Sequence, residues 1–328
     1  MKAVVIRGFG PPDVLAQEND YPMPEPLSNQ VLIKVTASGV NPLDLKIRKG
    51  MLRFIAPSKF PVILGNDASG VIVKSGSDVR DFIVGDQVYC MVDSNKRFAS
   101  SGFAKGGSYA EYCVTREDTL SLKPGTISSE EAAAVPLSCL TAYQALVHQA
   151  RIDNRSKVLI NGASGGVGVY AVQIAKAHHA EVTAVCSSRN TDLMRELGAD
   201  DVIDYREQEF CRLPDQFDLV YDVAATATYW KCKSILKKNG LYISNVAKPM
   251  NIITTYLFPI LGIFGFEKRS TFAWVKPSGK DLAAITGMIE AGKIRPIIDK
   301  VFSLDEIKDA HQYLESGMAK GKIIIKMQ

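Results

Sequence analysis

The sequence contains few of the residues from which metal centres and disulfide frameworks are built. Its 328 residues include only four histidines and six cysteines, and no two of the cysteines have the CxxC spacing. The lack of that spacing and of any tight cysteine cluster argues against both a structural zinc site and a disulfide framework. Scattered, reduced thiols are typical of a reducing compartment, so we expect a cytoplasmic protein. The cysteines are Cys90, Cys113, Cys139, Cys186, Cys211 and Cys232.

A strong charge of either sign is also lacking. The net charge is +4, charged residues make up 23% of the chain, and the basic residues are scattered. This balance predicts neither a nucleic acid nor a membrane surface as partner. The chain opens directly on the strand-like KAVVI, which leaves no room for a charged region followed by an apolar signal core.

No apolar run reaches the length of a membrane span. The nearly continuous apolar segment at residues 251–266, NIITTYLFPILGIFGF, contains one proline and two glycines. A spanning helix needs roughly 20 residues, so we predict no integral membrane span and interpret this segment as a buried or pocket-lining helix. An apolar wall of this kind suits an apolar substrate.

The hydrophobic pattern changes character twice along the chain. Up to about residue 123 it consists of short β segments bounded by Gly, Pro, Asn or Asp, which predicts an antiparallel, barrel-like region. Strand and helix patterns then alternate, which predicts a parallel sheet covered by helices. The terminal run IIIK needs a sheet to join, and the N-terminal region is the expected host. We therefore predict a doubly wound, Rossmann-type α/β domain (residues 124–267) inserted in a mostly antiparallel β-barrel domain (residues 1–123 and 268–328).

Four glycines crowd the junction between the first strand and helix of the alternating region. The stretch NGASGGVG, residues 161–168, forms an A-x-G-G-x-G arrangement in the strand–turn–helix context of a dinucleotide-binding fingerprint. Gly165 and Gly166 would leave backbone N–H groups open to a pyrophosphate, and Gly168 would let the helix pack close to the strand. A tight βα turn without a ligand is the alternative. The cofactor contacts predicted here come from Ala163, Ser164, Gly165, Gly166 and Val167.

The next predicted strand lacks an acidic residue at its end. An Asp or Glu about 20 residues beyond the glycines would bind both ribose hydroxyls of NAD and repel a 2′-phosphate. This chain has Ser187, Ser188, Arg189 and Asn190 there, which offer hydroxyl groups and a guanidinium able to hold a phosphate. The pattern favours NADPH over NADH, with an ordinary solvated arginine as the alternative interpretation of Arg189.

Five segments form a pattern that is more specific than the glycine turn alone. They are ASGVNPLDLKIRKG (37–50), FPVILGNDASG (60–70), GGSYAEY (106–112), AAAVPLSCLTAYQAL (132–146) and NGASGGVG. In this order they resemble the zinc-independent quinone oxidoreductase branch of the medium-chain dehydrogenase/reductase superfamily. The resemblance spans the chain and implies a GroES-like catalytic domain, an NADPH-binding Rossmann domain and a homodimer.

The resemblance also bears on metal binding, because the superfamily includes zinc alcohol dehydrogenases. Zinc members carry Cys where this chain has Asn41 and His where it has Asn66, and an amide is not a competent zinc ligand. Asp67 is the only potential ligand left at those two motifs. The third zinc cysteine would align near Leu137, from which Cys139 is offset, and the four-cysteine loop of the structural zinc is absent. We therefore expect no metal.

The NPxD motif of the resemblance supplies the candidate catalytic residues. In similar enzymes its Asn, here Asn41, faces the nicotinamide and the substrate, so its amide would donate to a developing oxyanion. A turn-forming Asn before Pro42 is the alternative. Asp44 is expected to be a structural acceptor at a helix start. Bacterial quinone reductases have a tyrosine where this chain has Lys46, which is interpreted either as a proton donor or as a solvated lysine.

Three further cofactor contacts are implied by the resemblance. Thr141 matches a position near the nicotinamide half of the cofactor, and Tyr205 matches a tyrosine that helps to hold the 2′-phosphate. Asn245 would lie at the sheet edge beside the nicotinamide, although a cap at the end of a strand explains it equally well.

The absence of zinc narrows the chemistry. Without a Lewis acid to stabilise an alkoxide, alcohol oxidation loses its main electrostatic support. Reduction of a quinone or an α,β-unsaturated carbonyl needs hydride delivery, hydrogen bonds to the developing anion and a proton. The sequence predicts an NADPH-dependent reductase of quinones or activated enones. Two alternatives stay open, namely an NADPH-binding redox sensor or structural protein with little turnover, and an NADP-dependent alcohol dehydrogenase.

Overall fold

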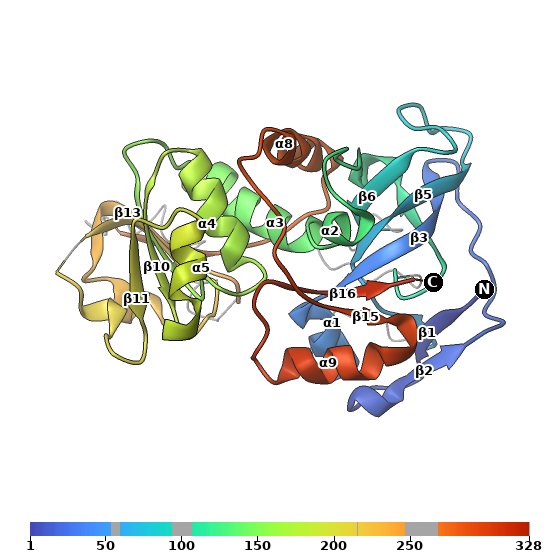
Figure 1. The fold of residues 1–328 in the computed structure, drawn as a ribbon, viewed down its shortest axis with the longest axis horizontal. Helices are drawn as coiled ribbons and strands as arrows, with labels where there is room; N and C mark the ends of the chain where they lie inside the picture. Colours follow the sequence, from blue (N-terminus) through green and yellow to red (C-terminus); the bar gives the residue numbers. More distant parts are fainter. Residues whose placement is uncertain (54–59, 94–106, 215, 247–267, 328) are drawn as a thin grey trace. The chain divides into compact units, whose positions relative to one another are not determined.

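The structure, a computed structural model, describes residues 1–53, 60–93, 107–214, 216–246 and 268–327. The chain divides into two compact units, one formed by Met1–Leu140 and Lys276–Gln328 and the other by Thr141–Val275. Figure 1 shows the chain coloured along its sequence, so that the first unit contains both the blue and the red ends. The apolar segment 251–266, interpreted above as a buried or pocket-lining helix, lies outside the described residues.

The first unit is built on a seven-stranded and a three-stranded sheet. The larger follows the order β15-β16-β3-β5-β6-β8, with β7 paired to β3, and the smaller follows β2-β1-β4. Every pairing except β15 with β16 is antiparallel, as predicted. The strands are β1 (Ala3–Ile6), β2 (Leu15–Glu18), β3 (Gln30–Val40), β4 (Val62–Ile63), β5 (Asp67–Ser75), β6 (Gln87–Met91), β7 (Tyr112–Arg116), β8 (Leu120–Leu122), β15 (Ile298–Ser303) and β16 (Lys322–Lys326).

Short helices accompany these sheets. They are α1 (Pro42–Arg48), α2 (Ser129–Ala133), α3 (Pro136–Tyr143), α8 (Gly279–Glu290) and α9 (Ile307–Glu315), with 3₁₀ turns at η1 (Pro12–Val14), η3 (Glu117–Thr119) and η8 (Leu304–Glu306). The helix α3 runs across the division between the two units.

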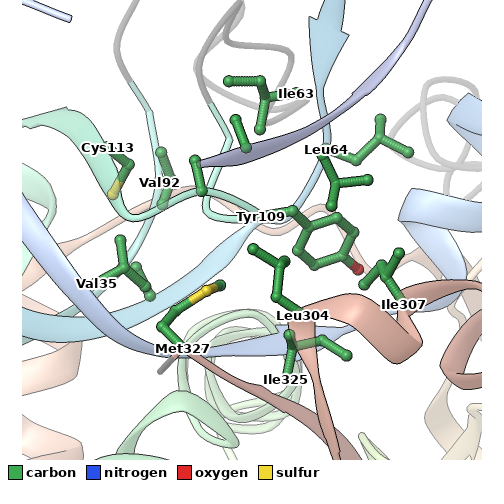
Figure 2. Packing of buried hydrophobic residues seen from close by; sticks show 14 of the residues in the cluster. Val35, Ile63, Leu64, Val92, Tyr109, Cys113, Leu304, Ile307, Ile325 and Met327 are labelled. Atoms are coloured by element: carbon green, nitrogen blue, oxygen red, sulfur yellow. The ribbon is translucent and has the colours of Figure 1, made fainter. Parts of the chain in front are cut away.

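The terminal run IIIK does join the N-terminal sheet. β16 pairs antiparallel with β3, placing Ile324 opposite Gly39 and Lys326 opposite Ala37. The core of the unit likewise combines residues from both ends of the chain. Figure 2 shows Tyr109 among Leu64, Leu304 and Ile307, which belong to one buried hydrophobic cluster.

The second unit is a parallel six-stranded sheet of the predicted Rossmann type. Its order is β11-β10-β9-β12-β13-β14, in which the chain starts in the middle and winds outwards first to one edge and then to the other. The strands are β9 (Lys157–Asn161), β10 (Glu181–Cys186), β11 (Asp201–Asp204), β12 (Phe217–Asp222), β13 (Leu236–Ser244) and β14 (Arg269–Phe272). The α-helices are α4 (Gly168–Ala177), α5 (Thr191–Glu196) and α6 (Tyr229–Cys232), with short helical turns at η4 (Gln144–Ala150), η5 (Ser188–Asn190) and η6 (Phe210–Arg212).

The two compact units meet in the sequence at 140/141 and 275/276, whereas the predicted domains meet at 123/124 and 267/268. Residues 124–140, predicted to open the nucleotide-binding domain, belong to the first unit. Ala133 and Ala134 at the end of α2 pack against Ala37 and Ile324 of its sheet. Residues 268–275, predicted to belong to the barrel, join the second unit because β14 is the last strand of its sheet. Apolar periodicity cannot tell which sheet a short strand will join, since either sheet would bury it.

No helix in the described part of the chain has the combination of length and apolar character that crossing a membrane requires.

Candidate functional site

The glycine-rich turn lies between β9 and α4, as predicted. Ser164, Gly165, Gly166 and Val167 are half-buried, whereas Ala163 and Gly168 are buried. The amide of Val169 closes a helical hydrogen bond to Gly165 O at 3.0 Å. Before it, Gly165 N donates to Gly162 O at 3.2 Å, and the N–H groups of Gly166 and Val167 are among those that a helix leaves without an intrahelical partner. This partly open turn therefore presents the positive end of α4 to an anion.

The glycines of this turn have different reasons to lack a side chain. Gly162 has a φ of +79°, and a Cβ there would lie 2.8 Å from the Ala224 side chain. A Cβ on Gly168 would lie 2.3 Å from Gly162 O, so Gly168 permits the predicted close packing. A Cβ on Gly165 would meet only Gly162 O, at 3.5 Å, which is ordinary contact. Packing thus requires Gly162 and Gly168 and leaves Gly165 available for binding.

The end of β10 carries one exposed cation beside buried polar groups. Ser187 and Asn190 are buried, whereas Arg189 is exposed. Among the residues that the structure describes, Arg189 has no ion-pair or hydrogen-bond partner. Tyr205, with 53% of its surface exposed, follows β11 on the neighbouring loop. Two groups able to bind a phosphate therefore project from adjacent strand ends.

Asn190 connects this strand end to the glycine turn. Its Nδ2 donates to Ser164 Oγ at 2.9 Å, while its buried Oδ1 has no hydrogen-bond partner among the described residues. The sequence shows Asn190 only as the neighbour of Arg189. Its bridging role depends on the two loops meeting, which no local pattern reveals.

An acidic residue does reach this edge, but from the next strand. Asp204, the last residue of β11, accepts hydrogen bonds from Ser188 N and Arg206 N, each at 2.9 Å. These backbone N–H donors, that of Arg206 above all, keep the pKa of Asp204 below its usual range. Both oxygens are thus bound to the loops that carry Arg189 and Tyr205. The Asp204 carboxylate therefore holds these two loops in place. The sequence pattern did not predict this role, because only the residues after β10 were considered for an acidic group.

The carboxyl edge of the parallel sheet contains a buried polar network. Asn161 Nδ2 donates to Asp222 Oδ1 at 2.7 Å and to Thr226 Oγ1 at 2.8 Å. Asp222 Oδ2 accepts from Tyr242 Oη at 2.7 Å and from Ala227 N at 2.9 Å. Burial, followed by the Asp222 carboxylate, raises the pKa of Tyr242, so the phenol stays protonated and donates. The network fixes the loop after β12, which packs against Gly162.

The two residues expected near the nicotinamide, Asn245 and Thr141, differ from each other in burial and in the element that carries them. Asn245 follows β13 half-buried, and its Oδ1 accepts from Tyr221 Oη at 2.7 Å. That bond turns the amide N–H groups of Asn245 away from Tyr221. Thr141 lies in α3 with 8% of its surface exposed. Their contacts with a cofactor stay predictions.

The first unit holds a buried ammonium group beside Asn41 and Asp67, two of the motif positions considered above as zinc ligands. Lys322, 2% exposed at the start of β16, donates to Asn41 Oδ1 at 2.5 Å and to Asp67 Oδ2 at 3.0 Å. Asp67 Oδ1 accepts from Leu137 N at 2.6 Å. Gly39 makes room for the pair, because a Cβ there would lie 2.5 Å from Asp67 Oδ2. Sequence reasoning missed Lys322, since a lysine opening an apolar strand is ordinarily solvated.

These bonds change the role expected for Asn41. Its Nδ2 donates to Asp67 Oδ2 at 2.9 Å and to Gly39 O at 3.3 Å, and the residue is fully buried. Both amide hydrogens therefore have acceptors inside the protein, which argues against direct donation from Asn41 to a substrate oxyanion. The arrangement favours the alternative, a structural Asn before Pro42.

Asp44 is the structural acceptor that the sequence predicts. Its Oδ2 accepts from Asn41 N at 2.8 Å and Tyr109 Oη at 3.2 Å, and its Oδ1 accepts from Asn66 Nδ2 at 2.7 Å and Gly65 N at 3.2 Å. Complete burial raises the pKa of Asp44 to about 6, against the opposing effect of the backbone donors. Asp44 thus ties the start of α1 to the loop before β5.

Lys46, the other candidate catalytic residue, lies half-buried in α1. No described residue gives its ammonium a hydrogen bond or an ion pair. It is therefore not absorbed into the buried cluster as Asn41 is, and its role as proton donor stays a prediction.

The donor set around Asp67 does not resemble a zinc site. Asn41 and Asn66 offer amides, Leu137 a backbone N–H, and Lys322 a cation that repels a metal ion. Burial raises the pKa of the Cys139 thiol, which opposes its acting as a thiolate ligand. Within the described residues no group of three or more His, Cys, Asp or Glu is arranged to hold a metal ion.

Comparison with known proteins identifies the family. The family described as "Alcohol dehydrogenase GroES-like domain" matches residues 27–125, and the one described as "Zinc-binding dehydrogenase" matches residues 197–325. The chain is 34% identical to "Quinone-oxidoreductase QR1, chloroplastic" of Triphysaria versicolor, over 99% of this chain and 98% of the relative. It is 35% identical to "NADPH-dependent alkenal/one oxidoreductase, chloroplastic" of Arabidopsis thaliana, over 99% and 79% respectively.

A solved structure agrees with these relatives. The quinone oxidoreductase from Coxiella burnetii superimposes with a TM-score of 0.85 at 32% identity, covering 100% of this chain and 99% of that one. The chain thus belongs to the quinone oxidoreductase branch of the medium-chain dehydrogenase/reductase superfamily. The fold predicted from sequence, a GroES-like unit with an inserted Rossmann-type sheet, is confirmed.

The different roles of the glycines predict different effects of adding a methyl group. Gly168→Ala should lower the free energy of unfolding by about 1–3 kcal/mol, because its Cβ overlaps backbone oxygens. Gly165→Ala should change it by no more than about 0.5 kcal/mol. The same Gly165→Ala change should weaken NADPH binding about tenfold, about 1.4 kcal/mol, by obstructing the turn. Chemical denaturation and fluorescence titration measure the two quantities, and unaltered affinity in Gly165→Ala would contradict binding at this turn.

The buried ion pair predicts strong coupling between Lys322 and Asp67. Lys322→Met and Asp67→Asn should each lower the free energy of unfolding by about 3–5 kcal/mol, because each leaves a buried charge unpaired. The double variant should lose clearly less than the sum of the single losses. Lys326→Met on the same strand is the matched control, since its pair with Glu130 is exposed and should contribute less than about 1 kcal/mol. A Lys322→Met loss no larger than this control would refute the coupling.

Proposed function

We propose that this protein is a zinc-free, NADPH-dependent oxidoreductase that reduces a quinone or an α,β-unsaturated carbonyl. The observation that carries the proposal is the partly open glycine turn next to a strand end with a free, exposed Arg189. Similarity over nearly the full length to proteins named quinone oxidoreductase and alkenal/one oxidoreductase supports the same reaction class.

The residues of the second unit fit a phosphorylated dinucleotide. The N–H groups of Ser164, Gly166 and Val167 would hold the pyrophosphate at the positive end of α4, whereas that of Gly165 donates to Gly162 O within the turn. Arg189 and Tyr205 would hold the 2′-phosphate, and Asp204 would keep their loops in place through its backbone bonds. We assign Thr141 and Asn245 to the nicotinamide half. When bound, NADPH supplies a hydride.

The first unit would provide a metal-free environment for the substrate. Lys322 supplies a fixed positive charge beside Asp67, so that this cluster needs no zinc to be neutral. Asn41 is proposed as a positioning residue that orders the segment before α1, and Lys46 as the candidate proton donor for the reduced substrate. A carbonyl or quinone oxygen that gains charge needs such a proton, whereas an alcohol substrate would need a Lewis acid.

Two further properties are proposed from the sequence and the family resemblance. We infer a homodimer formed through edge strands near residues 270–276, and a cytoplasmic location. β14 is an edge strand of the six-stranded sheet, which is compatible with pairing to a second copy.

Recognition of the 2′-phosphate is tested by neutralising Arg189. Arg189→Gln should lower kcat/KM for NADPH by about 10- to 150-fold, the equivalent of one charge-assisted hydrogen bond of about 1.5–3 kcal/mol. The value for NADH should stay unchanged, because NADH has no 2′-phosphate. Arg195→Gln, an exposed arginine on α5, is the matched control. Equal losses with both cofactors would argue that Arg189 acts on something other than the phosphate.

Turnover is tested with a panel of quinones, enones and simple alcohols, measured with NADPH and NADH after exhaustive metal chelation. We expect acceptor-dependent loss of NADPH absorbance with quinones or enones, undiminished by the chelator. Tight NADPH binding without any acceptor-dependent loss would favour the redox-sensor or structural alternative. Alcohol-dependent reduction of NADP would favour the alcohol dehydrogenase, and stoichiometric zinc in the purified protein would overturn the metal-free mechanism.

A further inference from the structure

Two cysteines that are 21 residues apart in the sequence meet in the second unit. Cys211 lies in η6 and Cys232 ends α6, and their Sγ atoms are 3.3 Å apart. Both are free thiols. All six cysteines lie within the described residues. Among them, Cys211 and Cys232 are the one pair in hydrogen-bond contact. The scattered spacing in the sequence gave no sign of it.

The surroundings of the pair do not suit a metal. The two sulfurs belong to a hydrophobic cluster that includes Phe210, Phe217 and Tyr229. No group of three metal-ligating side chains occurs in the described part of the chain, so the pair lacks the further ligands of a zinc site. Two thiols in contact without a metal have one other common chemistry, which is oxidation to a disulfide.

The two thiols are not equivalent. Cys211 has 7% of its surface exposed and Cys232 has none, while the other four cysteines have at most 2%. The two thiols share a hydrogen bond in which either sulfur can donate, and this bond lowers the pKa of Cys211 and raises that of Cys232. Because the thiolate is the nucleophile, Cys211 is the thiol that a small oxidant meets first.

We propose that Cys211 and Cys232 form a redox-active dithiol, with Cys211 as the attacking thiol, Cys232 as the resolving thiol and a hydroperoxide as the oxidant. The Cys211 sulfur attacks the peroxide O–O bond, which breaks as an S–O bond forms. The sulfur is oxidised to a sulfenic acid while the peroxide is reduced to an alcohol or water. Cys232 then attacks the Cys211 sulfur, forming the S–S bond, and the S–O oxygen leaves as water with the Cys232 proton.

The position of the pair links it to the cofactor-binding turn. The loop between β12 and α6 places Ala224 against Gly162, and its Thr226 Oγ1 accepts from Asn161 Nδ2 at 2.8 Å. Cys232 lies one short helix beyond this loop. The pair thus lies one short helix away from the segment that supports the glycine turn.

The experiment treats the intact, folded protein with hydrogen peroxide, blocks the remaining thiols by alkylation and maps peptides by mass spectrometry. We expect a peptide that links Cys211 to Cys232, with loss of both free thiols and recovery of both on adding dithiothreitol. In Cys232→Ser the link should be lost, and a sulfenic-acid probe should label Cys211 more strongly than in the unmodified sequence. Cys113→Ala, a buried thiol of the first unit, is the matched control and should leave the link intact.

Two results would overturn the proposal. One is that both thiols are recovered fully alkylated when the protein is treated with peroxide in its folded state, at a level sufficient to oxidise exposed methionines, and is then denatured for alkylation. The other is equal sulfenic-acid labelling of Cys211 with and without Cys232. Neither measurement depends on turnover or on NADPH, so the dithiol and the proposed enzymatic function stand or fall separately.

Discussion

The first unit depends on one buried ion pair that joins the end of the chain to its beginning. Lys322 opens the last strand, and its ammonium is held by Asp67 of β5 and Asn41 before α1. A charge taken out of water is tolerated only when it is paired, so β16 has one position in which its lysine is satisfied. This pairing favours the observed register of the last strand against β3, in which Ile324 lies opposite Gly39.

The same pair bears on the chemistry proposed for the first unit. The motif positions that hold metal ligands in zinc-dependent members are occupied here by two amides and a carboxylate already bonded to an ammonium. The chain therefore carries its own fixed cation. A fixed ammonium cannot coordinate and polarise an alcohol oxygen as zinc does, but it keeps a buried carboxylate neutralised. Reduction of an already electron-poor carbon is the reaction that such an environment leaves open.

The second unit relies on polar groups buried at the carboxyl edge of its sheet. Asn161 and Tyr242 both donate to Asp222, and Asp204 accepts from the two neighbouring loops. Each fixes a backbone segment that approaches the glycine turn or the cationic strand end. The turn amides and Arg189 are the groups available to a ligand. The buried polar groups, which a ligand does not reach, hold the loops that carry them. Cys211 and Cys232 lie beside this framework and offer a second chemistry to it.

Alternating strand and helix patterns and the glycine spacing sufficed to predict the fold class, the dinucleotide turn and the preference for a phosphorylated cofactor, because each is a local property. The motif segments sufficed to predict the family. Only the tertiary structure brought Lys322 to Asp67, Asp204 to the end of β10, and Cys211 to Cys232. In it the compact units divide at other residues than the predicted domains, and the amide of Asn41 donates to acceptors inside the protein. These outcomes depend on contacts between distant segments, whose partners are chosen by burial and by the cost of leaving a polar group unpaired.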